Sequence, residues 1–304
     1  MRVLVTGGRG YVGRRAVDRL VALGHEVFSY DRDHWVSDGP VVPVHGELYD
    51  TPRLLWALRE HAVDAIVHTA AISHPDVSLV APIATFEANV MGTVHLFEAA
   101  RLAGVTRIVN FSSSSVYGHV EGVVREDVPL RPLTPYGVTK LATEHLAEVY
   151  ARLHGFDVRS LRLTWAYGPG NRMPEFVGDM LTAAITDKPY TLESGTDHPL
   201  PLIYIDDAAE GTVRALLAEG PARPAYTVAG PEVPTLGTVA DLVRARYPRA
   251  TIEIGPGPLP LHQLPAIDLG AARADLGYEP RWTVERGLAV YADALERELA
   301  AVRL

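Results

Sequence analysis

The chain has 304 residues, of which 47% are hydrophobic and 21% charged, so it can bury a substantial core as a soluble globular protein. Its formal net charge of -9 argues against a nucleic-acid partner, which would require a basic surface. The chain has no cysteine, which excludes disulfides, thiolate metal sites and a cysteine nucleophile and fits a cytoplasmic location. No apolar run of about 20 residues is present, so we expect no membrane partner.

The N-terminal half alternates short β-branched runs with helical patterns. The first strand is predicted at 3–8, and the helix that follows begins near Val12 and ends at Gly24, a typical helix terminator. Further strands are predicted at 26–31, 41–44, 65–71, 107–115 and 157–163, and further helices at 51–61, around 82–103 and at 136–153. This alternation predicts an α/β fold with a doubly wound parallel sheet.

Beyond about residue 167 prolines and glycines become frequent and the alternation loosens. A strand and helix are predicted at 202–218, with Asp206 and Asp207 as a helix cap, and a last strand at 225–230. We therefore predict two units. The larger consists of 1–166 with 202–230, and the smaller C-terminal lobe consists of 167–201 with 231–304.

A glycine-rich segment, TGGRGYVG (6–13), joins the first strand to the first helix. Gly7, Gly10 and Gly13 let the backbone turn tightly and approach a pyrophosphate, while the helix N-terminus offers free N–H groups and a positive dipole end. A strand before the loop and a helix after it make the pattern specific for a Rossmann-type dinucleotide-binding domain. Two further residues of the loop are expected at the cofactor, Tyr11 and Val12.

Asp31 ends the second predicted strand, about 20 residues beyond the glycines, where a carboxylate can accept hydrogen bonds from the adenosine ribose. A carboxylate there repels a 2′-phosphate and favours NAD. Arg9 lies inside the loop and Arg32 directly follows Asp31, so NADP stays open as an alternative.

Tyr136 and Lys140 lie four residues apart in a predicted helix, so their side chains share one face. The chain has only one other lysine, Lys188. A compact ammonium close to a phenol can lower its pKa from about 10 towards neutrality and can also hold the nicotinamide ribose. The phenolate can then take a proton from a substrate hydroxyl during hydride transfer. A third group should donate a hydrogen bond to the same oxygen, and the serines at 112–115 supply four candidates.

These features together resemble the extended short-chain dehydrogenase/reductase family of the NAD-dependent epimerase/dehydratase type. The motifs that carry the resemblance are the glycine loop, HTAA (68–71), NVMGTVHLFEAA (89–100), SSSSVYG (112–118), YGVTK (136–140), YGPG (167–170) and DLGAARADLGYEPRWTVERGL (268–288). The resemblance covers essentially the whole chain. It implies that Ser113, four residues before Tyr117, is the catalytic serine. It also implies cofactor neighbours or supports at Glu47, Leu48, Ala70, Ala71 and Asn89.

The family includes dehydrogenases, 4-epimerases and dehydratases. Dehydratases resemble one another in an Asp-Glu pair where this chain has Ser114 and Ser115, so dehydration is disfavoured. Nucleotide-sugar epimerases typically have asparagine at the position of Trp165 and arginine at the position of Leu200, and both groups bind diphosphate. Epimerisation of a sugar or nucleotide sugar is the preferred interpretation. The alternative is a dehydrogenase or reductase of another sugar-like secondary alcohol, and a non-catalytic dinucleotide-binding regulator is the third.

The expected partner is a small, sugar-like substrate. Trp165 and His74 are substrate-site candidates, although either side chain could have only a packing role. The resemblance also implies a homodimer formed by the helices around 89–103 and 137–153. The sequence shows no cluster with metal-ligand spacing.

Overall fold

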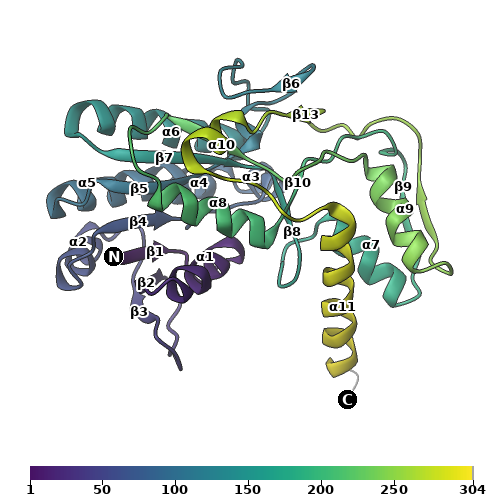
Figure 1. Ribbon diagram of the computed structural model, residues 1–304, viewed down its shortest axis with the longest axis horizontal. Coiled ribbons are helices and arrows are strands. Elements are labelled where there is room, and N and C mark those ends of the chain that lie inside the picture. The colour runs from purple at the N-terminus through teal and green to yellow at the C-terminus, as the bar shows by residue number, and fades with distance from the viewer. Residues whose placement is uncertain (303–304) are drawn as a thin grey trace.

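The structure, a computed structural model that describes residues 1–302, is built on a seven-stranded parallel sheet (Figure 1). The strand order is β11-β7-β5-β4-β1-β2-β3, which reverses direction after β1 as a doubly wound fold requires. The predicted α/β class is therefore confirmed. The strands are β1 (Arg2–Thr6), β2 (Glu26–Asp31), β3 (Val42–His45), β4 (Ala65–His68), β5 (Arg107–Ser113), β7 (Asp157–Leu163) and β11 (Ala225–Val228).

Helices cover both faces of this sheet because its strands are apolar on both sides. In β1, Val3 and Val5 face one core and Leu4 faces the other, as the two-residue strand period requires. The first core is covered by α1 (Tyr11–Ala22), α8 (Ile205–Leu217) and α10 (Gly270–Leu276). The second is covered by α2 (Thr51–Glu60), α5 (Gly92–Ala103) and α6 (Pro135–His154).

A third core lies in the C-terminal part, to the side of the sheet in Figure 1. Its helices are α7 (Phe176–Ile185), α9 (Leu236–Arg246) and α11 (Val284–Val302). Two short parallel pairs accompany it: β8 (Trp165–Tyr167) with β10 (Leu202–Tyr204), and β9 (Tyr190–Leu192) with β12 (Ile252–Ile254). A third pair, β6 (Val123–Val124) with β13 (Ala266–Ile267), lies in a separate small cluster with Val116 and Tyr117. No helix within residues 1–302 is both long and apolar enough to cross a membrane.

Several predicted boundaries are wrong where polar segments take over at the carboxyl edge. The strand predicted at 65–71 ends at His68, and the one predicted at 107–115 ends at Ser113 and continues as a tight turn at Ser114–Val116. A separate short helix, α3 (Pro75–Val80), precedes the helix predicted around 82–103. The predicted helix is itself divided into α4 (Pro82–Phe86), a wide, π-helical turn at Glu87–Met91, and α5. Such wide turns are frequent at functional sites.

The cap predicted at Asp206 and Asp207 is also wrong. Helix α8 has no side-chain cap at its start. Instead, the buried Asp207 carboxylate accepts hydrogen bonds from the backbone N–H groups of Arg281 (2.9 Å) and Trp282 (2.9 Å). It thereby connects α8, which packs on the sheet, to the segment leading into α11.

We expect the Asp207→Ala variant to lose about 2–4 kcal/mol of unfolding free energy, because two buried N–H groups lose their acceptor. Urea unfolding measures this loss. The adjacent Asp206→Ala variant is the matched control. The Asp206 side chain is 44% exposed and only loosely paired with Arg15, at 3.9 Å, so its loss should be below about 0.5 kcal/mol. Equal stability of the two variants would contradict this role of Asp207.

Candidate active site

The glycine loop after β1 forms a backbone cradle at the carboxyl edge of the sheet. Gly7 has φ +69°, and a Cβ atom there would lie 2.8 Å from the Ala70 Cα. A Cβ atom at Gly13 would overlap the Gly7 carbonyl oxygen. Gly10 precedes the first turn of α1, whose N–H groups have no intrahelical partners. This close backbone approach, with Ala70 against the loop, fits a dinucleotide pyrophosphate.

The adenosine end of the predicted cofactor site is formed by β2 and the segment after β3. The Asp31 carboxylate accepts hydrogen bonds from the Ser29 hydroxyl (2.5 Å) and the Arg9 backbone N–H (3.2 Å). Arg32 and Glu47 are exposed beside it, and Leu48 packs against Gly92. The remaining loop residues extend towards the third core. Tyr11 donates a hydrogen bond to the Gly168 carbonyl (2.9 Å), and Val12 packs in the same region.

Tyr136, Lys140 and Ser113 come together where β5 ends beside α6. Thr134 caps this helix by accepting a hydrogen bond from the Gly137 N–H (3.2 Å), so Tyr136 lies in the first turn. The Lys140 ammonium lies 5.8 Å from the centre of the Tyr136 ring and donates a hydrogen bond to the Phe111 carbonyl (2.7 Å). All three predicted side chains are buried, with exposed fractions of 6–8%.

Burial sets the protonation states of this group. It raises the pKa of the Tyr136 phenol to about 12, opposite to the lowering expected from Lys140, and a hydrogen bond with Ser113 partly opposes that increase. Burial lowers the pKa of the Lys140 ammonium to about 8, and the Glu144 carboxylate, one helical turn further on, raises it. In the protein without cofactor at pH 7, the phenol is therefore neutral and the ammonium is still charged.

Glu144 belongs to a buried ion pair that sequence reasoning missed. Its carboxylate is 2.8 Å from Arg162 Nη2 on β7, and the Ser112 hydroxyl donates a hydrogen bond to it. Arg162 also donates to the Tyr117 hydroxyl (3.1 Å). The signal was available, because Glu144 repeats the four-residue spacing of Tyr136 and Lys140 on one helix face.

The four serines at 112–115 therefore have different surroundings. Ser112 points to Glu144, while Ser113 lies within hydrogen-bonding reach of Tyr136. The Ser113 hydroxyl also accepts a hydrogen bond from the Ser115 N–H (3.1 Å), which fixes the turn, and Ser114 is fully buried. Ser112 and Ser113 are consecutive in β5 and therefore point to opposite faces of the sheet, which is why Ser113 and not Ser112 lies beside Tyr136.

Asn89 lies in the wide turn before α5 and supports two parts of the site. Its amide oxygen accepts a hydrogen bond from the Ile72 N–H (2.8 Å), and its amide nitrogen donates to the Ile72 carbonyl (3.0 Å) and the Thr139 hydroxyl (3.0 Å). Thr139 donates in turn to the Tyr136 carbonyl (2.7 Å). Asn89 thus fixes the segment after β4 against the helix that carries Tyr136.

The two substrate-site candidates differ in their surroundings. The His74 Nδ1 atom caps α3 by accepting a hydrogen bond from the Asp76 N–H (3.2 Å). The Trp165 ring is half-buried and stacks on Phe176, with ring centres 5.6 Å apart. Leu200 is fully buried in the third core.

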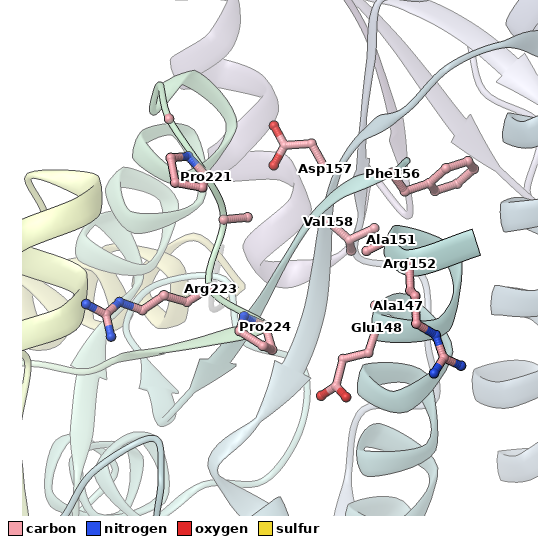
Figure 2. A pocket seen from close by; sticks show the side chains of 12 residues that line it. Ala147, Glu148, Ala151, Arg152, Phe156, Asp157, Val158, Pro221, Arg223 and Pro224 are labelled. Atoms are coloured by element: carbon pink, nitrogen blue, oxygen red, sulfur yellow. The ribbon is translucent and has the colours of Figure 1, made fainter. Parts of the chain in front are cut away.

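A hollow of about 620 Å³ lies at the opposite edge of the sheet (Figure 2). It is bounded by the C-terminal half of α6, the start of β7 and residues 220–224. Asp157, in its wall, pairs in register with Arg107 at the start of β5, whereas Ser113 ends that strand. The hollow therefore lies away from the candidate active site. Among residues 1–302, no three His, Cys, Asp or Glu side chains group as metal ligands.

Comparisons with known proteins agree with this geometry. The model of the NAD dependent epimerase/dehydratase family matches residues 3–229. The UDP-glucose 4-epimerase of Mycolicibacterium smegmatis is 30% identical over 95% of this chain and 96% of its own. The dTDP-glucose 4,6-dehydratase of Xanthomonas campestris pv. campestris (strain B100) is 26% identical over 95% and 92%. The solved UDP-glucose 4-epimerase of Thermus thermophilus, in complex with NAD, is 29% identical, with a TM-score of 0.86 over 97% of this chain and 98% of that chain.

We expect the stability of the protein to depend on pH through Lys140. Because its folded pKa of about 8 lies below the ordinary value of 10.5, the folded protein loses this proton before the unfolded chain does. The wild-type unfolding free energy should therefore rise between pH 8 and 10.5, relative to that of the Lys140→Met variant.

Urea unfolding at a series of pH values measures this difference. The chain offers one matched control, Lys188→Met, because Lys188 is the only other lysine and is exposed. Its pH profile should be parallel to that of the wild type. A wild-type profile parallel to that of Lys140→Met would contradict a perturbed Lys140.

Proposed function

Because the chain belongs to the NAD-dependent epimerase/dehydratase family and is therefore an enzyme, we propose that it epimerises a sugar or nucleotide sugar by reversible hydride transfer at a secondary alcohol. Family membership confirms the resemblance inferred from the motifs. The proposal rests on one observation: Tyr136, Lys140 and Ser113 lie together at the same edge of the sheet as the glycine cradle.

The cofactor in this proposal is NAD. The backbone of Gly7, Gly10 and Gly13 would hold the pyrophosphate, and Asp31 would accept hydrogen bonds from the adenosine ribose. The Asp31 carboxylate supports NAD over NADP because it would repel a 2′-phosphate. When bound, NAD supplies the group that accepts and returns the hydride.

The protein supplies the proton chemistry in this proposal. Tyr136 acts in its phenolate form, which takes the proton of the substrate hydroxyl and later returns it, while Ser113 donates a hydrogen bond to the same oxygen. The Lys140 charge stabilises the phenolate, and the Phe111 carbonyl keeps the ammonium in place. Glu144 favours the charged state of Lys140 against the cost of burial.

The residues that follow Ser113 favour epimerisation over elimination of water. Elimination of water requires an additional acid and base, whereas Ser114 and Ser115 follow Ser113 and offer neither. A second candidate function is a dehydrogenase or reductase of a sugar-like alcohol that carries no nucleotide. The observation that favours it is the apolar pair Trp165 and Leu200 where an anionic diphosphate would require donors or cations.

We also propose that the chain consists of two units with different binding roles and that it forms a homodimer. The sheet domain, residues 1–166 with 202–230, would bind the dinucleotide, and residues 167–201 with 231–304 would bind substrate, except for α10, which packs on the first core of the sheet. Support for a homodimer comes from exposed apolar side chains on and beside α5 and α6. These are Ile83, Phe86, Met91, Leu102, Val138, Val149 and Leu153.

The enzymatic proposal is tested with substrate sugars and UDP-sugars in the presence of catalytic NAD. We expect the two epimers to interconvert without stoichiometric NADH, because the hydride returns to the same carbon. The Tyr136→Phe variant should lose about 10²–10⁴-fold in turnover while NAD binding, measured by calorimetry, is unchanged.

Tyr150→Phe is the matched control, because Tyr150 lies on the same helix but bonds to Glu98. Its turnover should remain near that of the wild type. Stoichiometric accumulation of NADH would overturn the epimerase proposal in favour of the dehydrogenase. Full turnover by Tyr136→Phe would exclude Tyr136 as the acid/base.

The dimer is tested by light scattering. We expect the wild type at twice the chain mass of 33.0 kDa and a Met91→Arg/Val149→Arg double variant at the monomer mass, because buried unpaired charges oppose association. A Val36→Arg variant is the control, since Val36 is exposed away from this face. A monomeric wild type would contradict the dimer.

A further inference from the structure

Three buried imidazole nitrogens close to the Trp165 ring, and the hydroxyl of the residue before Trp165, have no hydrogen-bond partner within residues 1–302. They are both ring nitrogens of His198, the Nε2 atom of His262 and the hydroxyl of Thr164. His198 is fully buried, and its ring centre lies 6.3 Å from that of Trp165. The ring centre of His262 lies 6.1 Å from Trp165. Thr164 precedes Trp165 directly in the chain.

This cluster adjoins the proposed catalytic group. Leu163 pairs in register with Ser113 across β5 and β7, so Thr164 and Trp165 leave the sheet beside the Ser113 turn. The segment that carries His262 is held to the same region, because the Val120 N–H donates a hydrogen bond to the Gln263 carbonyl (3.1 Å). A substrate whose reacting carbon lies at Tyr136 and Ser113 would extend towards these groups.

The two imidazoles are uncharged at neutral pH. Burial lowers the pKa of both, and it lowers that of His262 to about 4, with His198 and His119 adding to the decrease. A neutral imidazole has one N–H donor and one lone-pair acceptor, and a threonine hydroxyl likewise donates and accepts. The cluster therefore presents mixed donors and acceptors rather than positive charge.

This chemistry discriminates between ligands. A buried polar group without a partner costs about 1–3 kcal/mol, so a ligand that satisfies several such groups gains affinity. Sugar hydroxyls both donate and accept and can complete every member of the cluster. A diphosphate accepts only, so it would leave the lone pairs unmatched, and the neutral imidazoles would offer it no positive charge. The Trp165 ring adds a flat apolar surface.

We propose that His198 and His262 bind the hydroxyl groups of an uncharged sugar beside Trp165, so that the substrate is a free sugar and not a nucleotide sugar. This inference rests on the proposed function, since it places the reacting carbon of that sugar at Tyr136. It selects one substrate class from the two that the proposed function includes.

The test measures binding, so that it does not depend on turnover. NAD-loaded Tyr136→Phe protein is titrated calorimetrically with a panel of free aldohexoses and aldopentoses and, separately, with UDP-glucose and UDP-galactose. We expect at least one free sugar to bind about tenfold more tightly than either UDP-sugar. Tighter binding of a UDP-sugar, or no binding of any free sugar, would overturn the proposal.

Two variants test the histidines on the same protein. His198→Leu and His262→Leu should each weaken binding of the best free sugar by about tenfold or more, with NAD affinity unchanged. His198→Gln, which keeps a donor and an acceptor, should restore part of the affinity and serves if His198→Leu fails to fold. His25→Leu, near the N-terminus, is the control. Sugar affinities within twofold of the parent in both leucine variants would overturn the assignment.

This design separates the two proposals. If free sugars bind through the histidines but the wild type never turns them over, the proposed function fails and the sugar site stands. If turnover depends on Tyr136 but only UDP-sugars bind, the proposed function stands and the sugar site fails.

Discussion

The burial of one ammonium group, that of Lys140, is the constraint around which the proposed active site is arranged. A charged amine removed from water requires an acceptor and a compensating charge. The Phe111 carbonyl supplies the first at 2.7 Å, and Glu144 supplies the second from the next helical turn. Glu144 is itself held by Arg162 on β7. The helix that presents Tyr136 is therefore fixed to two neighbouring strands, β5 and β7, by charged groups as well as by apolar packing.

The substrate side of the site is built on a different physical basis. The unpartnered imidazoles close to Trp165 are uncharged, and in the proposed site their donors and acceptors face a substrate that extends from Ser113. The charged, hydrogen-bonded network behind Lys140 suits proton chemistry at one oxygen. The neutral, unsatisfied cluster suits recognition of several hydroxyl groups. Together they divide the proposed reaction and the proposed recognition between two sets of residues.

Contacts between the sheet domain and the C-terminal part bring these sets together. Asp207 on α8 holds the backbone at Arg281 and Trp282, and Tyr11 at the start of α1 bonds to the Gly168 carbonyl. Both contacts start from helices that pack on the first core of the sheet. The cofactor cradle and the segment after Trp165 consequently share the same supporting elements.

Local sequence patterns were sufficient to predict the parallel sheet, the glycine cradle and the shared helix face of Tyr136 and Lys140, because each depends on residues close together in the chain. They could not predict that the Asp207 carboxylate accepts hydrogen bonds from a distant backbone segment instead of capping its own helix. They also could not predict that Ser112 points to Glu144. Nor did they give a reason to join His198 and His262, which lie far apart in the chain. Such pairings depend on strand register and on the packing of separate loops, which only the tertiary structure decides.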